Sequence, residues 1–315
     1  MTVQTTSKLQ QDLNLIRSLI SQGGPEEHQY EQVIKWTSKL REKHLNGIYS
    51  ELDIQLLCKA FGKDFMEHTL QGHGYRKPYG YAGDFEMIDK IYTQHTSTHS
   101  KYKKWDIFFH NQAAPQAVRN RKTFFQETLL RILKDKARPV ELLNVASGPC
   151  RDLMETYEKI DPARLKSTCV DMDPRAIAYA KKLNKDYREH ITFIQQNVFK
   201  LRLTQQFDLV WSAGLFDYFD DKPFVLVLKN LYRNVKPGGR LIIGNFSENN
   251  PSRAYMETMG NWFLHHRPAH HLAYLAQQAG IAPKYIEVQK EALGVNLFLC
   301  IDKAARTMSE RGRLR

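Results

Sequence analysis

Cysteine is scarce in this chain, and the few that it has lie far apart. The four are Cys58, Cys150, Cys169 and Cys300 among 315 residues, and no two of them form a Cys-x-x-Cys pair. This spacing predicts neither a zinc site nor a disulfide framework. Scattered thiols are typical of a reducing compartment, so we expect a cytoplasmic protein.

Long hydrophobic runs are also missing. No apolar stretch approaches the roughly 20 residues that a helix needs to cross a bilayer. The first twelve residues are polar, unlike the apolar core of a signal peptide. Hydrophobic residues make up 42% of the chain and charged residues 25%, a globular composition. We therefore expect a soluble protein with no membrane span.

Acidic residues are fewer than basic residues in this chain. The 34 Asp and Glu residues stand against 46 Lys and Arg, a net charge of +12. Such a balance favours anionic partners such as nucleic acid, lipid surfaces or carboxylates. The basic clusters at 101–104, 119–122 and 311–315 are short and are not interleaved with aromatics as a nucleic-acid recognition element would be. We therefore predict a solvated basic surface that can steer a small anionic substrate, and no stable nucleic-acid partner.

The first 138 residues show no strand pattern. Apolar residues recur at helical spacing over 7–69, where a third helix is predicted at 51–69. The segment 72–84 carries four glycines, a proline and three tyrosines, which predicts an irregular loop with a functional role. Asp84 is placed to cap a helix beginning at Phe85, and helical pattern also fills 105–136. We interpret residues 1–138 as a helical cap or substrate-binding region.

Beyond Pro139, apolar strands alternate with amphipathic helices, a pattern that indicates a parallel sheet covered on both faces. We predict strands at 140–146, 167–171, 191–195, 207–212, 240–246, 283–289 and 296–301. Helices are predicted at 151–160, 174–186, 223–234 and 270–279, with a helical insertion at 251–266. Only six residues separate the last two strands, too few for a crossover helix, so these strands should pair antiparallel.

The predicted fold class is thus α/β, with a Rossmann-like sheet over 139–303 that is mostly parallel and ends in an antiparallel hairpin. An all-helical N-terminal region precedes it, and a basic tail over 304–315 follows.

The turn after the first strand has few glycines for a nucleotide site. The run Ala146-Ser-Gly-Pro-Cys-Arg-Asp152 offers one glycine, Gly148, whereas the nicotinamide-dinucleotide fingerprint needs three to cradle a pyrophosphate. A nicotinamide-dependent dehydrogenase is therefore disfavoured. Gly148 still lets a ligand approach the carboxyl end of the strand, and a cofactor without phosphate tolerates the bulkier turn.

Polar residues follow the next strands at the same edge of the predicted sheet. Asp171 closes the second strand 23 positions beyond Gly148, near the spacing at which an acid accepts hydrogen bonds from ribose hydroxyls. Asp173 precedes Pro174 and is predicted to cap the following helix. Asn197, with Val198 beside it, is placed to bond an adenine edge. The run Ser212-Ala-Gly-Leu-Phe-Asp-Tyr218 completes the crevice.

In these motifs and in their order, the chain from about Pro139 to Lys303 resembles class I S-adenosylmethionine-dependent methyltransferases. The resemblance implies S-adenosyl-L-methionine as cofactor and S-adenosyl-L-homocysteine as product. The cofactor contacts implied are Ala146, Ser147, Gly148, Asp171, Met172, Asn197, Val198, Ser212, Ala213 and Gly214. The first motif departs from the family's acid-x-Gly-x-Gly-x-Gly form, having Asn144 and a single glycine.

A closer resemblance covers both halves of the chain. It is carried by Gly80-Tyr-Ala-Gly-Asp84, Ser212–Tyr218, and Gly244-Asn-Phe with Asn250-Pro-Ser-Arg253. These motifs are similar to those of bacterial methyltransferases of the 3-hydroxy fatty acid methyl ester biosynthesis type. The resemblance implies a bacterial enzyme that methylates the carboxylate of a lipid-like acid. N- or O-methylation of an amine or another natural-product nucleophile is the alternative, and nucleic-acid methylation has less support. A homodimer is a further expectation.

Methyl transfer needs an electron-rich acceptor that is held in line with the donor. A carboxylate acceptor needs no base, whereas a hydroxyl or ammonium acceptor must lose a proton. The predicted catalytic residues are Tyr81, Tyr218, His265 and Arg267, of which Arg267 or a neighbouring histidine could pair with a substrate carboxylate. Further candidates for the acceptor pocket are Tyr79, Asp84, Phe216, Asp217, Trp262 and His266. No metal site is predicted, because Pro268 interrupts the helix that would align His266 with His270.

Overall fold

The structure, a computed structural model, describes residues 7–305 and divides into two compact units. Unit 1 comprises the chain up to Gln116 together with Pro251–Phe263, and unit 2 comprises Ala117–Asn250 and the chain from Leu264. The predicted division at residues 138 and 139 differs from this one. Most of helix α8 (Ala113–Asp135) goes with unit 2 because its Phe125 and Leu129 are buried in a cluster with strand residues. Most of the predicted basic tail, residues 306–315, lies outside the described residues.

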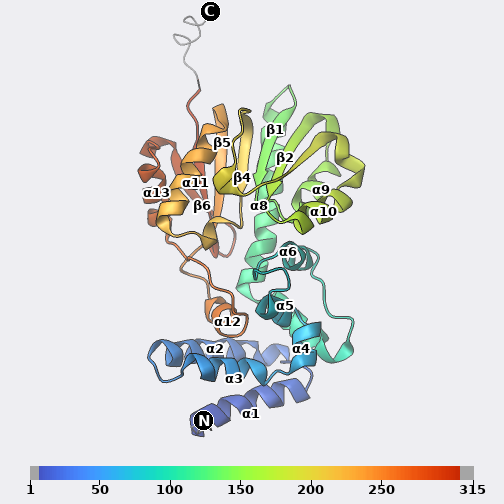
Figure 1. The fold of residues 1–315 in the computed structure, drawn as a ribbon, viewed down its shortest axis with the longest axis vertical. Coiled ribbons are helices and arrows are strands. Elements are labelled where there is room, and N and C mark those ends of the chain that lie inside the picture. Colours follow the sequence, from blue (N-terminus) through green and yellow to red (C-terminus); the bar gives the residue numbers. More distant parts are fainter. Residues whose placement is uncertain (1–6, 306–315) are drawn as a thin grey trace, which may run out of the picture. The chain divides into compact units, whose positions relative to one another are not determined.

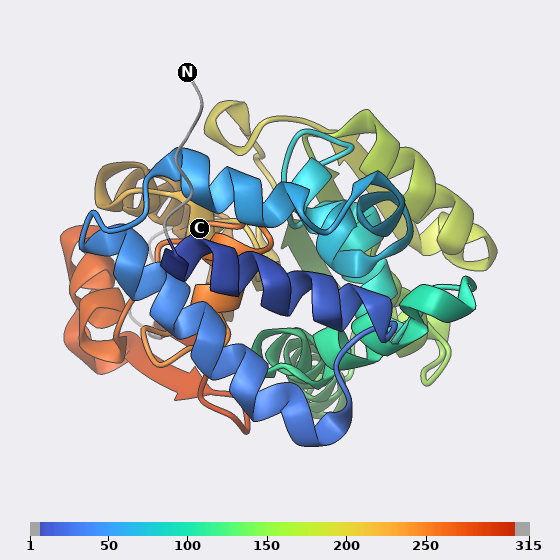
Figure 2. The same ribbon diagram turned by 90° about the horizontal axis from the view of Figure 1, so that it is seen from below.

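The described part of unit 1 is helical (Figures 1 and 2). Its α-helices are α1 (Ser7–Ser21), α2 (Tyr30–Leu45), α3 (Glu51–Lys59), α4 (Lys63–His68), α5 (Leu70–Arg76), α6 (Phe85–Tyr92), α7 (Lys103–Asn111) and α12 (Arg253–Thr258). Two 3₁₀ turns are η1 (Glu27–Gln29) and η2 (Ser100–Tyr102). Figure 2 shows α1, in the darkest blue, alongside α2 and α3.

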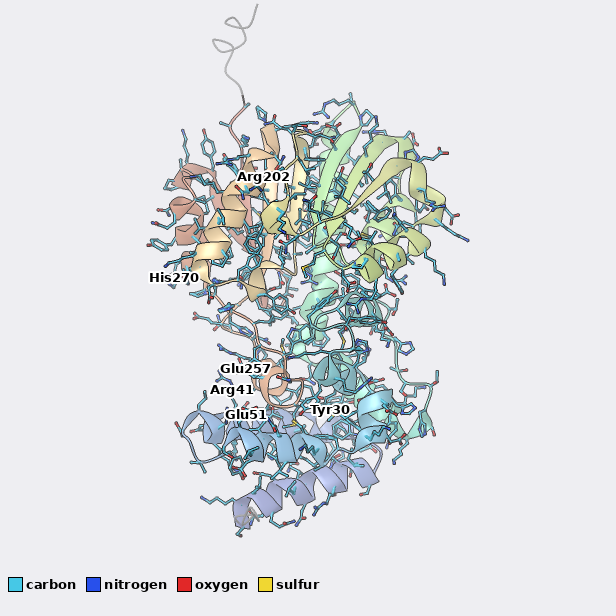
Figure 3. All side chains as sticks on the ribbon, viewed as in Figure 1. Tyr30, Arg41, Glu51, Arg202, Glu257 and His270 are labelled. Carbon is cyan, nitrogen blue, oxygen red and sulfur yellow. The ribbon has the colours of Figure 1, made fainter. Side chains whose placement is uncertain are left out.

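A buried aromatic cluster and an ion pair hold unit 1 together. The rings of Phe61, Phe65 and Trp105 pack with centroids 4.8 to 5.6 Å apart. Arg41 Nε of α2 donates to Glu257 Oε2 of α12 at 2.5 Å, and the two side chains lie together in Figure 3. This bond helps to explain why α12, so distant in sequence, belongs to unit 1.

The helix predicted over 51–69 is two helices. The chain breaks at Gly62, which has a φ of +84° and precedes α4. Left-handed backbone is readily adopted by glycine, so the interruption is encoded at this residue. The prediction of one helix rested on apolar residues that occur in both helices.

The prediction of an irregular loop from residue 72 was wrong at its start, because Gly72 and Gly74 lie inside α5. A Cβ atom at Gly72 would lie 2.2 Å from the carbonyl oxygen of Met66 and 2.4 Å from its Cα. Glycine is therefore needed here for the close approach of α4 and α5, not for flexibility. The predicted cap at Asp84 is confirmed: its carboxylate accepts the N–H of Met87 at 2.8 Å.

Gly72→Ala should destabilise the protein by about 1–3 kcal/mol or more, because the new methyl group meets backbone atoms that cannot move aside. Gly74→Ala is the matched control in the same helix: its Cβ would meet the flexible end of Met87 at 3.5 Å and the carbonyl oxygen of Gly260 at 3.8 Å, both ordinary contact distances. That change should be neutral, or stabilising by about 0.5–1 kcal/mol. Chemical denaturation of both variants measures the difference, and equal stabilities would contradict the packing argument.

Unit 2 is built on a seven-stranded sheet with the order β3-β2-β1-β4-β5-β7-β6. The strands are β1 (Val140–Val145), β2 (Leu165–Asp171), β3 (Ile191–Gln195), β4 (Phe207–Ser212), β5 (Val235–Phe246), β6 (Ile286–Lys290) and β7 (Asn296–Asp302). The pairs from β3 to β5 are parallel, whereas β7 runs antiparallel to both β5 and β6. The predicted fold class is confirmed. Strand β5 begins earlier than predicted, and Lys236-Pro-Gly-Gly239 is part of it.

Helices cover both faces of the sheet, as Figure 1 shows. They are α8, α9 (Arg151–Tyr157), α10 (Pro174–Leu183), α11 (Asp221–Arg233) and α13 (Ala269–Gln278). Helices α11 and α13 bury their apolar residues in one cluster and α8 and α9 in another. Alternate residues of β7 join the two clusters, Leu299 in the first and Phe298 in the second. Such alternation is expected of a strand that is buried on both faces. No described helix is long and apolar enough to cross a membrane.

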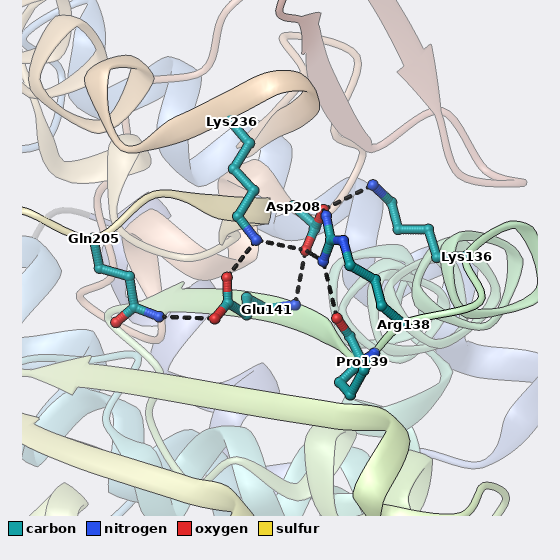
Figure 4. Close-up of polar contacts among 7 residues, drawn as sticks. All are labelled: Lys136, Arg138, Pro139, Glu141, Gln205, Asp208 and Lys236. Atoms are coloured by element: carbon teal, nitrogen blue, oxygen red, sulfur yellow. Dashed lines mark hydrogen bonds and ion pairs between the residues drawn. The ribbon is translucent and has the colours of Figure 1, made fainter. Parts of the chain in front are cut away.

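Asp208 is the centre of an ion cluster near the amino ends of β4 and β1 (Figure 4). The carboxylate is buried and accepts hydrogen bonds from Lys136 at 2.7 Å, Arg138 at 2.6 and 2.9 Å, and Lys236 at 3.0 Å. It also accepts the N–H of Glu141 at 3.0 Å. The cluster joins β1, β4, β5 and the end of α8 at the edge opposite the carboxyl ends of the parallel strands.

Candidate functional site

The reversal of strand order between β1 and β4 places a switch point in the middle of the sheet of unit 2. Strands β2 and β3 lie on one side of β1, and the chain returns across it to place β4 on the other. Ligands of open α/β sheets bind in the crevice outside the carboxyl ends of the strands at such a point. The residues after Val145 and Ser212 are therefore the first to consider.

The turn after β1 has an unusual backbone. Ala146, Gly148 and Cys150 all have positive φ, of 52°, 54° and 53°. Left-handed backbone at two non-glycine residues is strained, and such residues concentrate at ligand-binding sites. A Cβ at Gly148 would meet nothing within 4 Å, so open space adjoins the turn on that side.

Asp171 joins this turn to the end of β2. Its Oδ2 accepts the N–H of Gly148 at 2.9 Å, and its Oδ1 accepts the N–H of Asp173 at 3.0 Å. Burial raises the pKa of Asp171, and these backbone N–H groups oppose the rise. Each carboxylate oxygen has a second lone pair, so Asp171 can hold the turn and still accept a hydrogen bond from a ligand.

Two serine hydroxyls at the carboxyl ends of the central strands are buried and unsatisfied. Neither Ser147 Oγ nor Ser212 Oγ has a hydrogen-bond partner in the described part of the chain. An unpaired buried hydroxyl costs free energy, on the order of 1–3 kcal/mol. A bound molecule that supplies a partner to each would remove this cost.

Arg121 of α8, which is not among the predicted site residues, lies beside the same strand end. Its guanidinium is 5% exposed, donates from Nη1 to the carbonyl of Ala213 at 2.5 Å, and lies 3.5 Å from where a Cβ of Gly214 would be. Its Nε has no partner within residues 7–305. The prediction that 119–122 forms part of a solvated surface is wrong for Arg121. The signal for burial was present, because Arg121 continues the helical stripe of Ala114, Ala117, Val118 and Phe125.

Two buried acids share the surroundings of Arg121. Burial raises the pKa of Asp152 and of Asp217 to about 6 each, and the charge of Arg121 opposes both shifts. Asp217 Oδ1 accepts the N–H of Phe246 at 2.6 Å, and Asp152 Oδ1 accepts the N–H of Leu153 at 2.9 Å. These acids fix the ends of β4, β5 and α9 next to the switch point.

Arg267, predicted to bind a substrate carboxylate, is 3% exposed and engaged by the protein itself. Its guanidinium donates to Asp221 Oδ1 at 3.1 and 3.2 Å and to Asn245 Oδ1 at 3.0 Å. It also bonds the carbonyls of Phe216 and Phe219. These contacts tie α11 to the segments after β4 and β5, so the structure favours a positioning role for Arg267.

The other predicted catalytic residues differ in exposure and in unit. Tyr218 is 39% exposed, and the side chain of His265 is 47% exposed with Nε2 at 3.6 Å from Asp220 Oδ1. Both lie in unit 2, on segments joined by the bond from the His265 N–H to the Asp217 carbonyl at 2.7 Å. Tyr81 is half-buried and belongs to unit 1.

The remaining predicted cofactor residues lie on the turns after β2 and β3. Met172 is 64% exposed, and Val198 is partly buried against the core. Asn197 is exposed, and its Oδ1 accepts the N–H of Phe199 at 2.9 Å. Their side chains stay available at the same edge of the sheet as Asp171.

The histidine-rich segment is bonded to its neighbours. His266 Nε2 lies 3.2 Å from Asn250 Nδ2, and His271 Nε2 lies 2.9 Å from Asp221 Oδ2. Across residues 7–305, no group of three or more His, Cys, Asp and Glu side chains is placed to hold a metal ion.

Comparison with known proteins identifies the sheet unit. Residues 142–239 match a family model described as a methyltransferase domain, and this segment contains the turn after β1, Asp171 and the end of β4. No curated protein matches the chain significantly.

Solved structures share the fold at low sequence identity. A possible exported protein from Bordetella parapertussis has a TM-score of 0.60 and 17% identity, over 75% of this chain and 86% of its own. The magnesium protoporphyrin IX methyltransferase ChlM from Synechocystis PCC 6803, with bound S-adenosylhomocysteine, has a TM-score of 0.51 and 11% identity, over 73% and 97%. The S-adenosylmethionine-dependent methyltransferase SibL in its apo form has a TM-score of 0.50 and 15% identity, over 79% and 74%.

The features at the switch point suit S-adenosylmethionine. The turn at Gly148 is open and has no pyrophosphate cradle, Asp171 offers acceptors, and Ser147, Ser212 and Arg121 offer buried donors. With residues 142–239 forming a methyltransferase domain on this fold, the protein is an S-adenosylmethionine-dependent methyltransferase.

Proposed function

We propose that the acceptor is the carboxylate of a small lipid-like acid, best a 3-hydroxy fatty acid, and that the product is its methyl ester. The observation that carries this proposal is the state of Asp217, the buried acid that follows β4. Its Oδ1 is held by the N–H of Phe246, and it serves the structure rather than standing open as a base. A carboxylate acceptor is already ionised and needs no base. The net charge of +12 would attract such an anion.

The methyl donor supplies an electrophilic methyl group on a sulfonium centre. In our proposal Asp171 accepts hydrogen bonds from the ribose of the donor, and the N–H of Gly148 keeps that carboxylate in place. Asn197 and Val198 bind the adenine, with Ala146 and Met172 beside the donor. Arg121, through its unsatisfied Nε, pairs with the carboxylate of the donor's amino-acid end.

The remaining residues in this proposal line the site around the donor or contact the acceptor. Ser147 and Ser212 gain hydrogen-bond partners when the site is filled, and Ala213 and Gly214 lie beside the donor. Tyr218 and His265 contact the acceptor from the segments after β4 and before α13. The role of Tyr81, which belongs to unit 1, stays a prediction. Positioning of the two reactants and exclusion of water lower the barrier, since the displacement itself needs no further group.

The alternative acceptor is an amine or another protic nucleophile. It is favoured by the pKa of Asp217, which burial raises to about 6. A carboxyl group with that pKa could take a proton from an acceptor near neutral pH.

The dependence of the rate on pH separates these functions. With labelled S-adenosylmethionine and a series of 3-hydroxy fatty acids, we expect a base-labile methyl ester to form. Its maximal rate should be nearly flat above about pH 6, because the acceptor is ionised there. A rate that rises through about pH 6 with an amine acceptor, and no ester from any acid, would instead support the alternative and assign a base to the site.

Three further expectations belong to the same proposal. All four cysteines are free and buried, which suits a reducing cytoplasm. A bacterial origin follows only from the motif resemblance. The expected homodimer can be measured directly by analytical ultracentrifugation of the full chain.

A further inference from the structure

Unit 1 contains a polar cavity of about 340 Å³ that lies entirely within residues 67–106. It is lined from α4, α5, α6, the connection after α6, and α7. Its ionisable lining residues are Glu67, His68, His73, Arg76, Glu86, Lys90, His95 and Asp106. The cavity is lined in part by the beginning of the motif 72–84. The proposed methyl transfer assigns no role to these first residues of the motif.

A buried imidazole on α5 forms part of the cavity wall. His73 is 6% exposed, and its Nε2 lies 2.8 Å from Oδ2 of Asp84, which is 0% exposed. Asp84 Oδ1 accepts the N–H of Met87, so both carboxylate oxygens are fixed. His73 Nδ1 makes no hydrogen bond within the described residues, and the ring faces the cavity. Because Nε2 is engaged by Asp84, Nδ1 is the ring nitrogen that remains for a ligand.

The acids of the cavity are already neutralised or occupied. Glu86 pairs with Lys90 at 2.7 Å and accepts the hydroxyl of Tyr79 at 2.7 Å. Both oxygens of Asp106 accept backbone N–H groups, of Leu70 at 2.8 Å and of Ser97 at 2.7 Å. Burial raises the pKa of Asp106 to about 6. Glu67 is exposed and lies 3.8 Å from Lys63.

The donors of the cavity are in excess. Arg76 uses Nε to bond the carbonyl of Met66 at 2.8 Å, and its two terminal nitrogens bond no described residue. The side chain of His95 is likewise unbonded, and His68 contacts Asp64 through Nδ1 alone. Once the acids are paired, one guanidinium and three imidazoles still face the same space.

We propose that this cavity binds a small oxyanion, a carboxylate or phosphate group, between Arg76 and His73. Arg76 supplies its planar pair of N–H donors, a geometry that matches two oxygens of the ligand. His73 supplies Nδ1–H when it is protonated. The buried Asp84 keeps the imidazole oriented and compensates its charge, as in other carboxylate–histidine pairs. All the residues that line this cavity belong to unit 1.

Isothermal titration of the full-length protein at about pH 6 tests the proposal, with inorganic phosphate and acetate as separate probes and sodium chloride to match ionic strength. We expect saturable binding of at least one probe, and the probe preferred distinguishes phosphate from carboxylate ligands. Arg76→Gln and His73→Gln should each weaken binding about tenfold by removing a charged donor.

The controls separate loss of the site from loss of the fold. Lys39→Gln removes an exposed cation of unit 1 that does not line the cavity, and it should bind as the wild type does. Arg76 is exposed, so its substitution should leave the fold and the binding of S-adenosylmethionine unchanged even if His73→Gln does not fold. No saturable binding of either probe, or equal binding by wild type and Arg76→Gln, would overturn the proposal and leave the methyltransferase assignment untouched.

Discussion

Replacing Asp171 with alanine should abolish measurable binding of S-adenosylmethionine. The change removes the acceptor proposed for the ribose and also frees the N–H of Gly148, so the turn after β1 loses the bond that orders it. Hydrogen bonds to charged groups contribute about 1.5–3 kcal/mol each, so losing two predicts at least a hundredfold weaker binding. Calorimetric titration with S-adenosylmethionine and S-adenosylhomocysteine measures the effect directly.

Asp173→Ala is the matched control, because it removes a neighbouring buried acid that has another purpose. Asp173 caps α10 by accepting the N–H of Arg175 at 2.9 Å, so its loss should cost about 1 kcal/mol of stability. Binding of the donor should persist in this variant. Wild-type affinity in Asp171→Ala would show that this carboxylate does not bind the cofactor. Failure of the wild type to bind would count against the cofactor site altogether.

Asp208→Asn should cause one of the largest losses of stability in the molecule. The substitution leaves Lys136, Arg138 and Lys236 facing one another without the buried charge that holds them. Removing one partner of a buried ion pair costs about 3–5 kcal/mol; we expect about 2–4 kcal/mol here, because Arg138 is half exposed and solvent screens it. Chemical denaturation measures this change. Asp302→Asn breaks an exposed pair with Arg240 and should cost less than about 1 kcal/mol.

The Asp208 cluster also gives the stability of the protein an acid dependence. Burial alone would raise the pKa of Asp208, but the bonds from Arg138 and Lys136 outweigh it and hold the pKa well below the ordinary value of 3.8. A carboxyl group with a depressed folded-state pKa contributes stability fully above its unfolded pKa and loses it as the pH falls towards the folded value. Wild type should therefore lose stability below about pH 4, and the difference between wild type and Asp208→Asn should shrink there. A difference that is constant with pH would contradict this account.

Much of the fold of unit 2 could be predicted because its signals are local. Strands β3 and β4 have the predicted bounds, and the short connection between the last two strands correctly required an antiparallel hairpin. The cap at Asp84 was likewise readable from one residue. Strand bounds, a short connection and a helix cap are all properties of a contiguous segment, so neighbouring residues suffice to predict them.

Other features depend on residues that are distant in sequence. The prediction of a loop at Gly72 is wrong because the need for glycine there, room for the backbone of Met66, arises only once α4 and α5 are packed. The grouping of 251–263 with unit 1 could not be predicted, because Arg41 and Glu257 are distant in sequence and meet only in the folded chain. In each case the deciding contact is tertiary, and no pattern of neighbouring residues encodes it.

The same distinction applies to the site. The sequence alone determined that a turn with a single glycine, an acid at the end of the second strand and small residues after the fourth lie at one edge of a parallel sheet. Their position follows from the alternation of strands and helices, because all the parallel strands then end at the same edge of the sheet. Only the tertiary structure decided that Arg121 is buried beside Ala213 and that Arg267 is fully engaged by contacts within the protein. It also decided that His73 and Asp84 pair at the cavity in unit 1. Burial of a charge depends on what packs over it, and that is set by the whole fold rather than by the segment that carries the residue.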